Sequence, residues 1–186
     1  ERKGMQKKYD LRERVLPASV DVSVPSPLEF AEYLVQTYLR AYGFTTVKQI
    51  THLKKGAVLR NNVDTVLNSM LEEGLLQKVA VEGMPAVFVP TAVMEQSVGV
   101  VAPAVRFLSP FDNSIIHRDR LQQLFGYDFR LECYVPQAKR LYGYFCLPIL
   151  FGTAFIGRMD CKAHRKEKRF EVIHLHVENE GIPVEA

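Results

Sequence analysis

Apolar positions in the first half of the chain recur every three or four residues, a spacing that predicts amphipathic helices. A first helix is expected over residues 28–42, and Gly43 is placed to end it, because glycine adopts a left-handed helix cap without steric cost. The apolar face of that helix is formed by Phe30, Leu34, Tyr38 and Ala41. Further helices are predicted over residues 46–53 and 60–73. The first half of the chain therefore begins its fold with three helices.

Two β-prone runs, LLQKVAVEG and MPAVFVP, follow the helices and meet at Glu82 and Gly83. Glycine at that point permits the positive φ of a tight hairpin. Three helices followed by a hairpin is the layout of a winged helix, an elaborated helix-turn-helix. We therefore predict a winged-helix domain over residues 28–90. A connector over residues 1–27, with one short helix ending before Pro17, precedes it.

The second half of the chain is dominated by alternating apolar and polar residues, which indicate strands. A linker over residues 91–102, with a short helix at its start, leads into this half. Strands are predicted over residues 129–135, 143–150, 154–163 and 169–177, with one helix over 118–125. The predicted fold class is α+β, a winged helix followed over residues 103–186 by a small antiparallel β-barrel or curved sheet. The aromatic side chains expected in its core are Tyr134, Tyr142, Tyr144, Phe145 and Phe151.

Composition places the chain among ordinary globular proteins and adds little about function. The 186 residues are 47% hydrophobic and 24% charged, with a formal net charge of +3. No run of 18 apolar residues is present, so neither a membrane span nor a membrane partner is expected. The three cysteines form no CxxC pair, which predicts buried free thiols and a cytoplasmic protein. The chain begins with Glu1 rather than Met, from which we expect a fragment or a processed chain.

Cations gather at the start of the third predicted helix, which would be the recognition helix of a winged helix. The residues expected to contact DNA there are Lys54, Lys55, Arg60 and Asn61. Lysine and arginine neutralise phosphates, and asparagine hydrogen-bonds phosphates or base edges. A solvated helix start, capped by Asn62, is the structural alternative. The hairpin itself carries Lys78 as its one cation and Glu82 at its tip, which weakens the case for a DNA-reading wing.

A second basic group lies on the predicted strand over residues 154–163 and the turn that follows it. Alternation places Arg158, Asp160 and Lys162 on one polar face, which leads into a basic tip. The residues expected to contact DNA are Arg158, Lys162, Arg165 and Lys166. A basic hairpin that projects from a sheet can probe a groove or the phosphate backbone. The alternative is a solvent-facing strand on which Asp160 pairs with its neighbouring cations.

A third group of polar residues, within the phrase SPFDNSIIHRDR, could line a pocket. The candidates for a ligand cleft are Asp112, His117, Arg118 and Arg120. Arginine could hold a phosphate while a carboxylate orients a water molecule. Turn formation at the start of the phrase, and an exposed Asp119–Arg120 pair on a helix start, are the structural alternatives.

No metal and no cofactor are expected. His174 and His176 would share one face of a strand, but Cys161 on the partner strand points away from His164 by alternation. No phosphate-binding loop GxxxxGK[ST], no GxGxxG, no HExxH and no GxSxG occurs in the sequence. The common signatures of nucleotide, metal and serine-hydrolase chemistry are therefore missing.

Three phrases, SPFD, YVPQAKRLYGYFCLPIL and GRMDCKAHRK, together with YDLRERVLP upstream, resemble the winged-helix DNA glycosylases that act on alkylated bases and interstrand crosslinks, the AlkZ-like family. The resemblance covers residues 9–177 and matches the C-terminal region of those enzymes. It implies that residues 28–90 form their last winged helix and residues 103–180 their barrel. It also implies a double-stranded DNA partner, hydrolysis of N-glycosidic bonds without a metal, and a cytoplasmic protein that associates with the nucleoid when bound to DNA.

The catalytic signature of that family is a glutamine followed two residues later by glutamine or aspartate. None of the eight glutamines in this chain satisfies the pattern, so the resemblance assigns no catalytic residue here. We therefore expect a DNA-binding part whose chemistry, and whose partner domains, lie upstream in the same polypeptide. The alternative function is that of a winged-helix transcription regulator with a β domain that binds a ligand or a protein.

Overall fold

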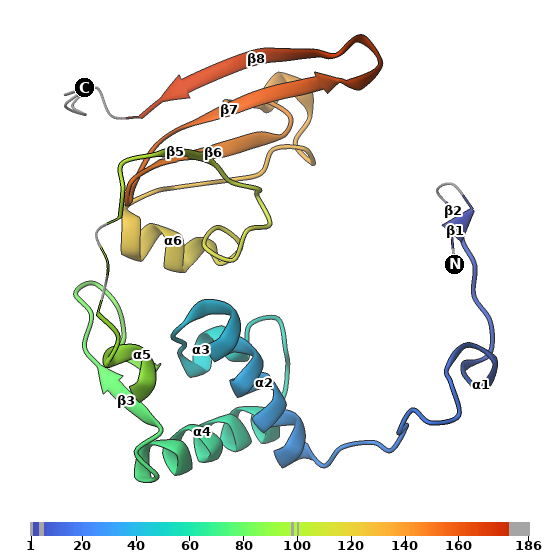
Figure 1. Ribbon diagram of the computed structural model, residues 1–186, viewed down its shortest axis with the longest axis vertical. Coiled ribbons are helices and arrows are strands. Elements are labelled where there is room, and N and C mark those ends of the chain that lie inside the picture. Colours follow the sequence, from blue (N-terminus) through green and yellow to red (C-terminus); the bar gives the residue numbers. More distant parts are fainter. Residues whose placement is uncertain (1, 4–5, 98, 100, 179–186) are drawn as a thin grey trace.

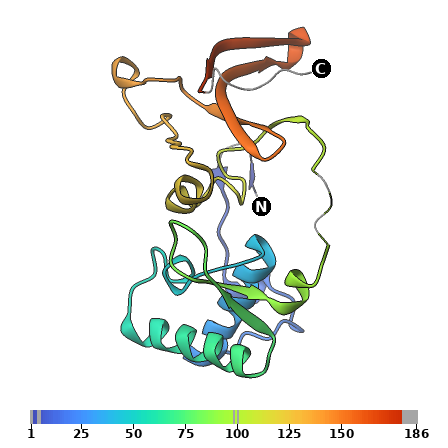
Figure 2. The ribbon, with the colours of Figure 1, turned by 90° about the vertical axis from the view of Figure 1, so that its left-hand side faces the viewer.

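The computed structural model describes residues 2–3, 6–97, 99 and 101–178, and it divides into a helical part and a sheet part (Figures 1 and 2). The helical part contains α2 (Pro27–Tyr42), α3 (Val47–Ile50), α4 (Ala57–Glu72), β3 (Leu76–Val79), β4 (Val87–Pro90) and α5 (Thr91–Met94). The sheet part contains β5 (Val105–Phe107), α6 (Arg118–Phe125), β6 (Cys146–Phe151), β7 (Ala154–His164) and β8 (Arg169–Val177), with 3-10 turns η1 (Gln137–Lys139) and η2 (Arg165–Glu167). Preceding both parts are β1 (Arg2–Lys3), β2 (Gln6–Lys7) and α1 (Arg12–Val15).

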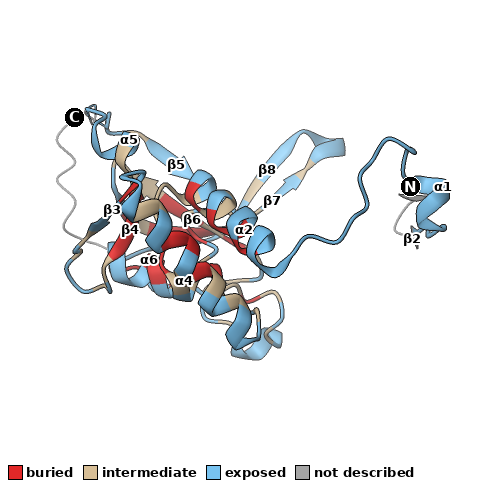
Figure 3. Cartoon of the chain, turned by 90° about the horizontal axis from the view of Figure 1, so that it is seen from below, coloured by how far each residue is buried: buried red, intermediate tan, exposed pale blue. Residues whose placement is uncertain are grey.

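The helical part is built around the packing of α2 on α4. Their apolar faces form one core with Ala31, Val35 and Leu67 fully buried (Figure 3). Ser26 starts α2 with a capping box, since its hydroxyl accepts from the Glu29 N–H while the Glu29 carboxylate accepts from the Ser26 N–H. Gly43 ends the helix in the left-handed conformation, at φ 75°, as predicted.

The order of three helices and a hairpin agrees with the prediction for residues 28–90, but two boundaries differ. The third helix, α4, begins at Ala57, one turn before residue 60, and Gly56 stands at its N-cap. Asn62 therefore lies inside the helix and does not cap it. The connection between β3 and β4 runs from residue 80 to residue 86, which makes it a long loop rather than a tight hairpin turn.

The sheet part is an open antiparallel sheet of order β5-β6-β7-β8. The predicted closure into a barrel is wrong, because β5 and β8 form the two edges among the described residues. The predicted strand over residues 129–135 does not form, so the sheet lacks one of the strands that closure would use. Residues 127–135 instead form an irregular segment, in which Tyr127 and Phe129 are buried in one core with Phe155. Apolar burial, rather than strand pairing, decides its conformation.

Two polar side chains of β7 are buried, so the predicted polar stripe on this strand is not a solvent-facing one. Arg158 is only 3% exposed, and its guanidinium lies 4.0 Å from the Tyr142 ring centroid. Asp160 does not pair with a neighbouring cation: its carboxylate accepts from the backbone N–H of Tyr144 at 2.6 Å. Two aromatic residues predicted in the core, Tyr134 and Tyr144, are exposed instead.

The three cysteines are free thiols, of which Cys146 is buried and Cys133 and Cys161 are half-buried. Burial raises the pKa of the Cys146 thiol to about 11, so this side chain stays protonated and packs as an apolar group. In the described part of the chain, no helix is long and apolar enough to cross a membrane.

Candidate functional site

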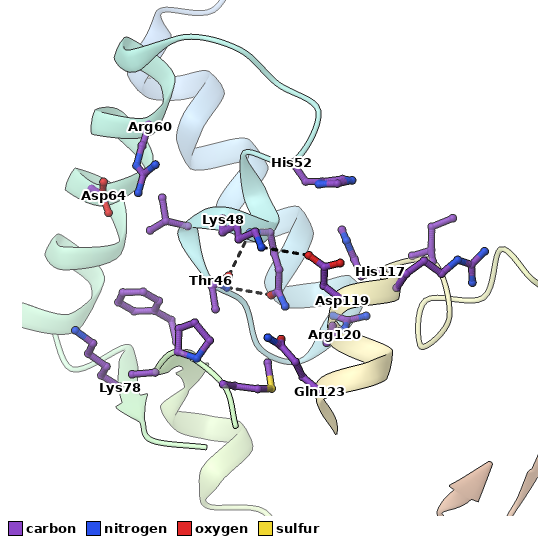
Figure 4. A pocket seen from close by; sticks show the side chains of 18 residues that line it. Thr46, Lys48, His52, Arg60, Asp64, Lys78, His117, Asp119, Arg120 and Gln123 are labelled. Atoms are coloured by element: carbon purple, nitrogen blue, oxygen red, sulfur yellow. Dashed lines mark hydrogen bonds and ion pairs between the residues drawn. The ribbon is translucent and has the colours of Figure 1, made fainter. Parts of the chain in front are cut away.

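A cavity of about 690 Å³ lies where the helical part meets the sheet part (Figure 4). Its walls come from α3 and α4, from the loop between β3 and β4, and from the first turns of α6. The two parts contact each other directly beside it. The Asn113 side-chain amide donates to the carbonyl oxygen of Ala41 at 3.1 Å, and the Lys48 ammonium pairs with the Asp119 carboxylate at 3.2 Å.

Positive charge predominates around the cavity. Five cationic side chains line it against two carboxylates, those of Asp64 and Asp119. The five are Lys48, Arg60, Lys78, Arg118 and Arg120. A concave surface with an excess of cations raises the local concentration of anions. The cavity is therefore suited to a negatively charged ligand.

Arg120 forms the floor between this cavity and a smaller neighbouring one of about 330 Å³. It is 5% exposed, and its guanidinium lies 4.3 Å from the Tyr42 ring centroid and 5.5 Å from that of Phe44. One terminal nitrogen, Nη2, donates to the carbonyl oxygen of Asn113. The other, Nη1, is buried and has no hydrogen-bond partner. Buried donors without partners are rare, and this one lies beneath the surface of the cavity.

His117 stands at the N-cap of α6 and lies close to three rings of the helical part. Its ring centroid lies 5.0 Å from that of Tyr42, 5.8 Å from that of His52 and 6.0 Å from that of Tyr38. Burial, with smaller contributions from the nearby charges of Arg120, His52 and Lys54 that outweigh the opposing one of Asp119, lowers the pKa of His117 to about 4. The ring is therefore neutral near pH 7 and offers a stacking surface rather than a charge.

The low pKa of His117 makes the junction sensitive to acid. An unfolded histidine has a pKa of about 6.5, so between pH 6.5 and about 4 the unfolded state binds the additional proton. The free energy of unfolding should fall by on the order of 2 kcal/mol as the pH drops through that window. His117→Phe, which does not titrate, should show a shallower decline in urea unfolding measured at several pH values. Parallel profiles for the two proteins would contradict this assignment.

Of the residues predicted to contact DNA from the helical part, only one lines the cavity. Arg60 lines the cavity from the first turns of α4. Lys54, Lys55 and Asn61 lie outside the cavity lining. The Lys54 ammonium donates to the Ile50 carbonyl oxygen at 3.2 Å and to the Tyr38 hydroxyl at 3.4 Å. Lys55 and Asn61 are exposed.

Three of the four cations predicted on β7 and its tip lie at or near the turn of the β7–β8 hairpin, which projects away from the helical part (Figure 1). Lys162, Arg165 and Lys166 are exposed there. Arg158 is not part of this exposed group. Its Nε donates to the Glu178 carboxylate at 2.6 Å, and its Nη2 donates to the Asp128 carbonyl oxygen at 2.6 Å. A buried guanidinium with these partners stabilises the sheet part and does not face a ligand.

Of the four residues predicted to line a ligand cleft, three reach the cavity. His117, Arg118 and Arg120 line it, while Asp112 lines the smaller neighbouring cavity. The Asp112 carboxylate is held in its own turn, where it accepts from the Ser114 N–H at 2.9 Å. The Arg118 guanidinium donates to two loop carbonyl oxygens, of Ile115 at 2.8 Å and Pro110 at 3.2 Å. The Asp119–Arg120 pair, which was the structural alternative, does not form, since Asp119 pairs with Lys48 across the junction.

Sequence reasoning missed several residues of the cavity, among them Lys48, His52, Asp64 and Gln123. Lys48 belongs to a helix of four residues, and its carboxylate partner is 71 residues away in sequence. No local pattern indicates such a pairing. Lys78 was noted as the hairpin cation, and it lines the cavity from β3.

No group of three or more His, Cys, Asp and Glu residues within the described ranges could hold a metal ion. His174 and His176 lie on the same face of β8, as alternation predicts. Each contacts Tyr142, the first through its Nδ1 at 3.1 Å from the carbonyl oxygen and the second through its ring at 4.9 Å between centroids.

Comparison with protein families gives a match over nearly the whole chain. The family model described as DNA glycosylase AlkZ-like matches residues 1–185. No solved structure matches the chain.

Proposed function

The chain belongs to the AlkZ-like DNA glycosylase family, and on this premise we propose that it is a DNA-binding part of a repair glycosylase that removes alkylated or crosslinked purine bases. The observation that carries the proposal is the cavity between the helical part and α6, where five cationic side chains stand against two carboxylates. Double-stranded DNA carries about one negative charge per 1.7 Å of helix axis, and cations that neutralise it release counterions. The five cationic side chains of the cavity wall can neutralise phosphates in this way.

In this proposal the helical part is the winged helix, with its three helices and long hairpin loop as one DNA-facing surface. Lys48, Arg60 and Lys78 come from three different elements of it and line the same cavity (Figure 4). Phosphate contacts fix the position of a protein on the duplex and carry little sequence information. Such contacts suit an enzyme that must find a lesion in any sequence.

The floor of the cavity is the proposed lesion cleft. His117 is neutral there and lies against the rings of Tyr42 and His52. These rings form an aromatic surface on which a displaced or modified base can stack. Arg120 contributes its positive charge to this floor, while its Nη1 is itself buried beneath the surface. We assign these residues to ligand contact and positioning.

A second, separate contact is proposed at the tip of the β7–β8 hairpin, through Lys162, Arg165 and Lys166. Glu167 and Glu171 are occupied with Arg169, at 3.4 Å each. Each of the three proposed cations is exposed, and none forms an ion pair with a described residue. Cations without a local carboxylate partner are available to phosphates.

No residue of this chain is proposed to break the glycosidic bond, because no glutamine here fits the catalytic signature of the family. We expect the chain to bind duplex DNA that carries alkylated purines and to release no base. Strand cleavage at abasic sites by hot alkali measures base release directly. The background is the cleavage of the same alkylated duplex incubated without the protein. Cleavage above that background would contradict this expectation and would place a catalytic group within these residues.

Sequence preference distinguishes the repair proposal from a regulatory one. A repair module should bind random duplexes with similar affinity, whereas a transcription regulator binds its own site typically 10³- to 10⁷-fold more tightly than other DNA. Selection of bound sequences from a random duplex pool would test this. Enrichment of one motif would favour the regulator, and an unenriched pool would favour repair.

A further inference from the structure

Leu53, in the turn between α3 and α4, combines two properties that folding alone does not explain. Its side chain is 91% exposed, so it contributes little to the core of the helical part. Its backbone is left-handed, at φ 59°. Residues other than glycine and asparagine rarely adopt this region, because their Cβ crowds the following carbonyl oxygen. Leucine therefore strains the turn, and packing of its side chain does not offset that strain.

The turn around Leu53 is fixed on both sides. The Lys54 N–H donates to the Thr51 carbonyl oxygen at 3.0 Å, which closes a four-residue turn with Leu53 at its third position. The Lys54 ammonium donates to the carbonyl oxygen of Ile50 at 3.2 Å, and Ile50 is fully buried. The Thr51 hydroxyl donates to the Val47 carbonyl oxygen at 2.8 Å. These bonds hold the Leu53 side chain out into solvent.

A positive φ at the third position of such a turn is normally supplied by glycine or asparagine. A strained residue that the surrounding structure holds in place is a frequent feature of functional sites. Since the Leu53 side chain serves neither the turn nor the core, we look for its use in a contact outside the fold.

The chain around Leu53 is cationic. Residues 46–63 carry four lysine and arginine side chains and no aspartate or glutamate. The four are Lys48, Lys54, Lys55 and Arg60. A surface with an excess of cations attracts an anionic partner. One leucine among lysines offers too little apolar surface for a protein interface, whereas one apolar side chain is enough to enter a single step of a base stack.

Leu53 also adjoins the cavity that is proposed to bind DNA. The preceding residue, His52, lines the cavity, and its ring centroid lies 5.8 Å from that of His117 (Figure 4). Leu53 itself lies outside the lining. Its side chain therefore stands beside the cavity, where a duplex bound at the cavity would come within reach.

We infer that Leu53 is a wedge, whose side chain enters the base stack of a bound duplex at a step that a lesion has weakened. Apolar side chains that enter between base pairs partly unstack them and kink the duplex. A step already weakened by damage costs less to open than an intact one, so the wedge favours distorted over intact DNA. This inference rests on the proposed DNA-binding function and adds to it the residue that recognises distortion.

The test measures fluorescence anisotropy with a fully paired duplex and with the same duplex carrying one central thymine–thymine mismatch. The wild-type chain should bind the mismatched duplex about 5-fold or more tightly than the paired one, and Leu53→Asn should reduce this preference below about 2-fold. The steepness of the salt dependence should not change, because leucine carries no charge. A 2-aminopurine base beside the mismatch should brighten with the wild-type chain, as it unstacks, and not with the variant.

Three further variants separate the wedge from a general loss of structure. Asparagine adopts the left-handed region readily, so the urea midpoint of Leu53→Asn should equal or exceed that of the wild type. Leu53→Met keeps an apolar side chain and should keep the preference. The matched control Leu141→Asn makes the same change at a leucine of the sheet part that is 77% exposed, and it should bind as the wild type does. If Leu53→Asn fails to reproduce the wild-type circular dichroism spectrum, Leu53→Gly replaces it.

Equal affinity of the wild type for the two duplexes overturns the wedge and leaves the proposed DNA-binding function standing. A preference that survives in Leu53→Asn, or one that is lost equally in Leu141→Asn, overturns it in the same way. No binding to either duplex at low salt contradicts the proposed function itself, and the wedge falls with it.

Discussion

Replacing Arg158 by methionine should lower the free energy of unfolding by roughly 2 to 3 kcal/mol, because it removes a buried guanidinium and leaves the acceptors that it bonds without their partner. The Arg158 guanidinium donates to Glu178 and to the Asp128 carbonyl oxygen. It also lies 4.0 Å from the ring centroid of Tyr142 and 4.9 Å from that of Tyr127. Methionine fills much of the same volume but makes none of these polar contacts. Urea unfolding followed by circular dichroism measures the loss.

Lys162→Met is the matched control for this prediction. It removes the same charge from the same face of the same strand, but Lys162 is exposed, so the change should stay within about 0.5 kcal/mol. A loss below about 1 kcal/mol for Arg158→Met would contradict the structural role given to Arg158. In that case the residue would again be a candidate for DNA contact, as its place in the sequence suggested.

Simultaneous replacement of Lys48, Arg60 and Lys78 by alanine should weaken binding to random-sequence duplex DNA by roughly 10- to 100-fold at about 0.1 M salt. Each cation that contacts one phosphate contributes about 0.9 to the slope of log affinity against log salt concentration. The triple variant should therefore lower the steepness of that slope by about 2 to 3. Fluorescence anisotropy of a labelled duplex gives both quantities.

The control for the triple variant removes three exposed cations elsewhere: Arg12, Arg14 and Lys139, each replaced by alanine. Net charge falls equally in the two proteins, so a difference between them reports position rather than total charge. Equal loss of affinity in both would contradict a site at the cavity. It would leave only a diffuse attraction between a basic protein and DNA.

The sequence predicted individual elements well where the determinants are local. Helix α6 has the predicted bounds because a polar start and the left-handed Gly126 delimit it, and β8 likewise runs over residues 169–177. The predicted strand over residues 129–135 failed for a non-local reason. Phe129 is apolar enough for a strand, but it is buried against the rings beside Phe155 in a loop.

The candidate site could be predicted only in part, for the same reason. His117, Arg118 and Arg120 were found because they lie close together in sequence, and the structure places all three on the cavity. The opposite wall comes from α3 and the hairpin loop, and only tertiary packing brings Lys48 to Asp119. Alternation on β7 correctly placed Arg158 and Asp160 on one face, but a register shift puts Phe155 on that face as well, which alternation alone does not predict. Alternation also could not tell which face was inside, so Arg158 was predicted to contact DNA.

The central claim is that the cavity between the helical part and α6 binds the DNA backbone. Its most direct test is the anisotropy of the wild-type chain with a labelled random-sequence duplex, across a salt series from about 20 to 300 mM. The account predicts binding whose logarithm falls linearly with the logarithm of salt concentration, with a slope of about −3 or steeper for three or more phosphate contacts. No binding at the lowest salt, or binding that salt does not weaken, would contradict it.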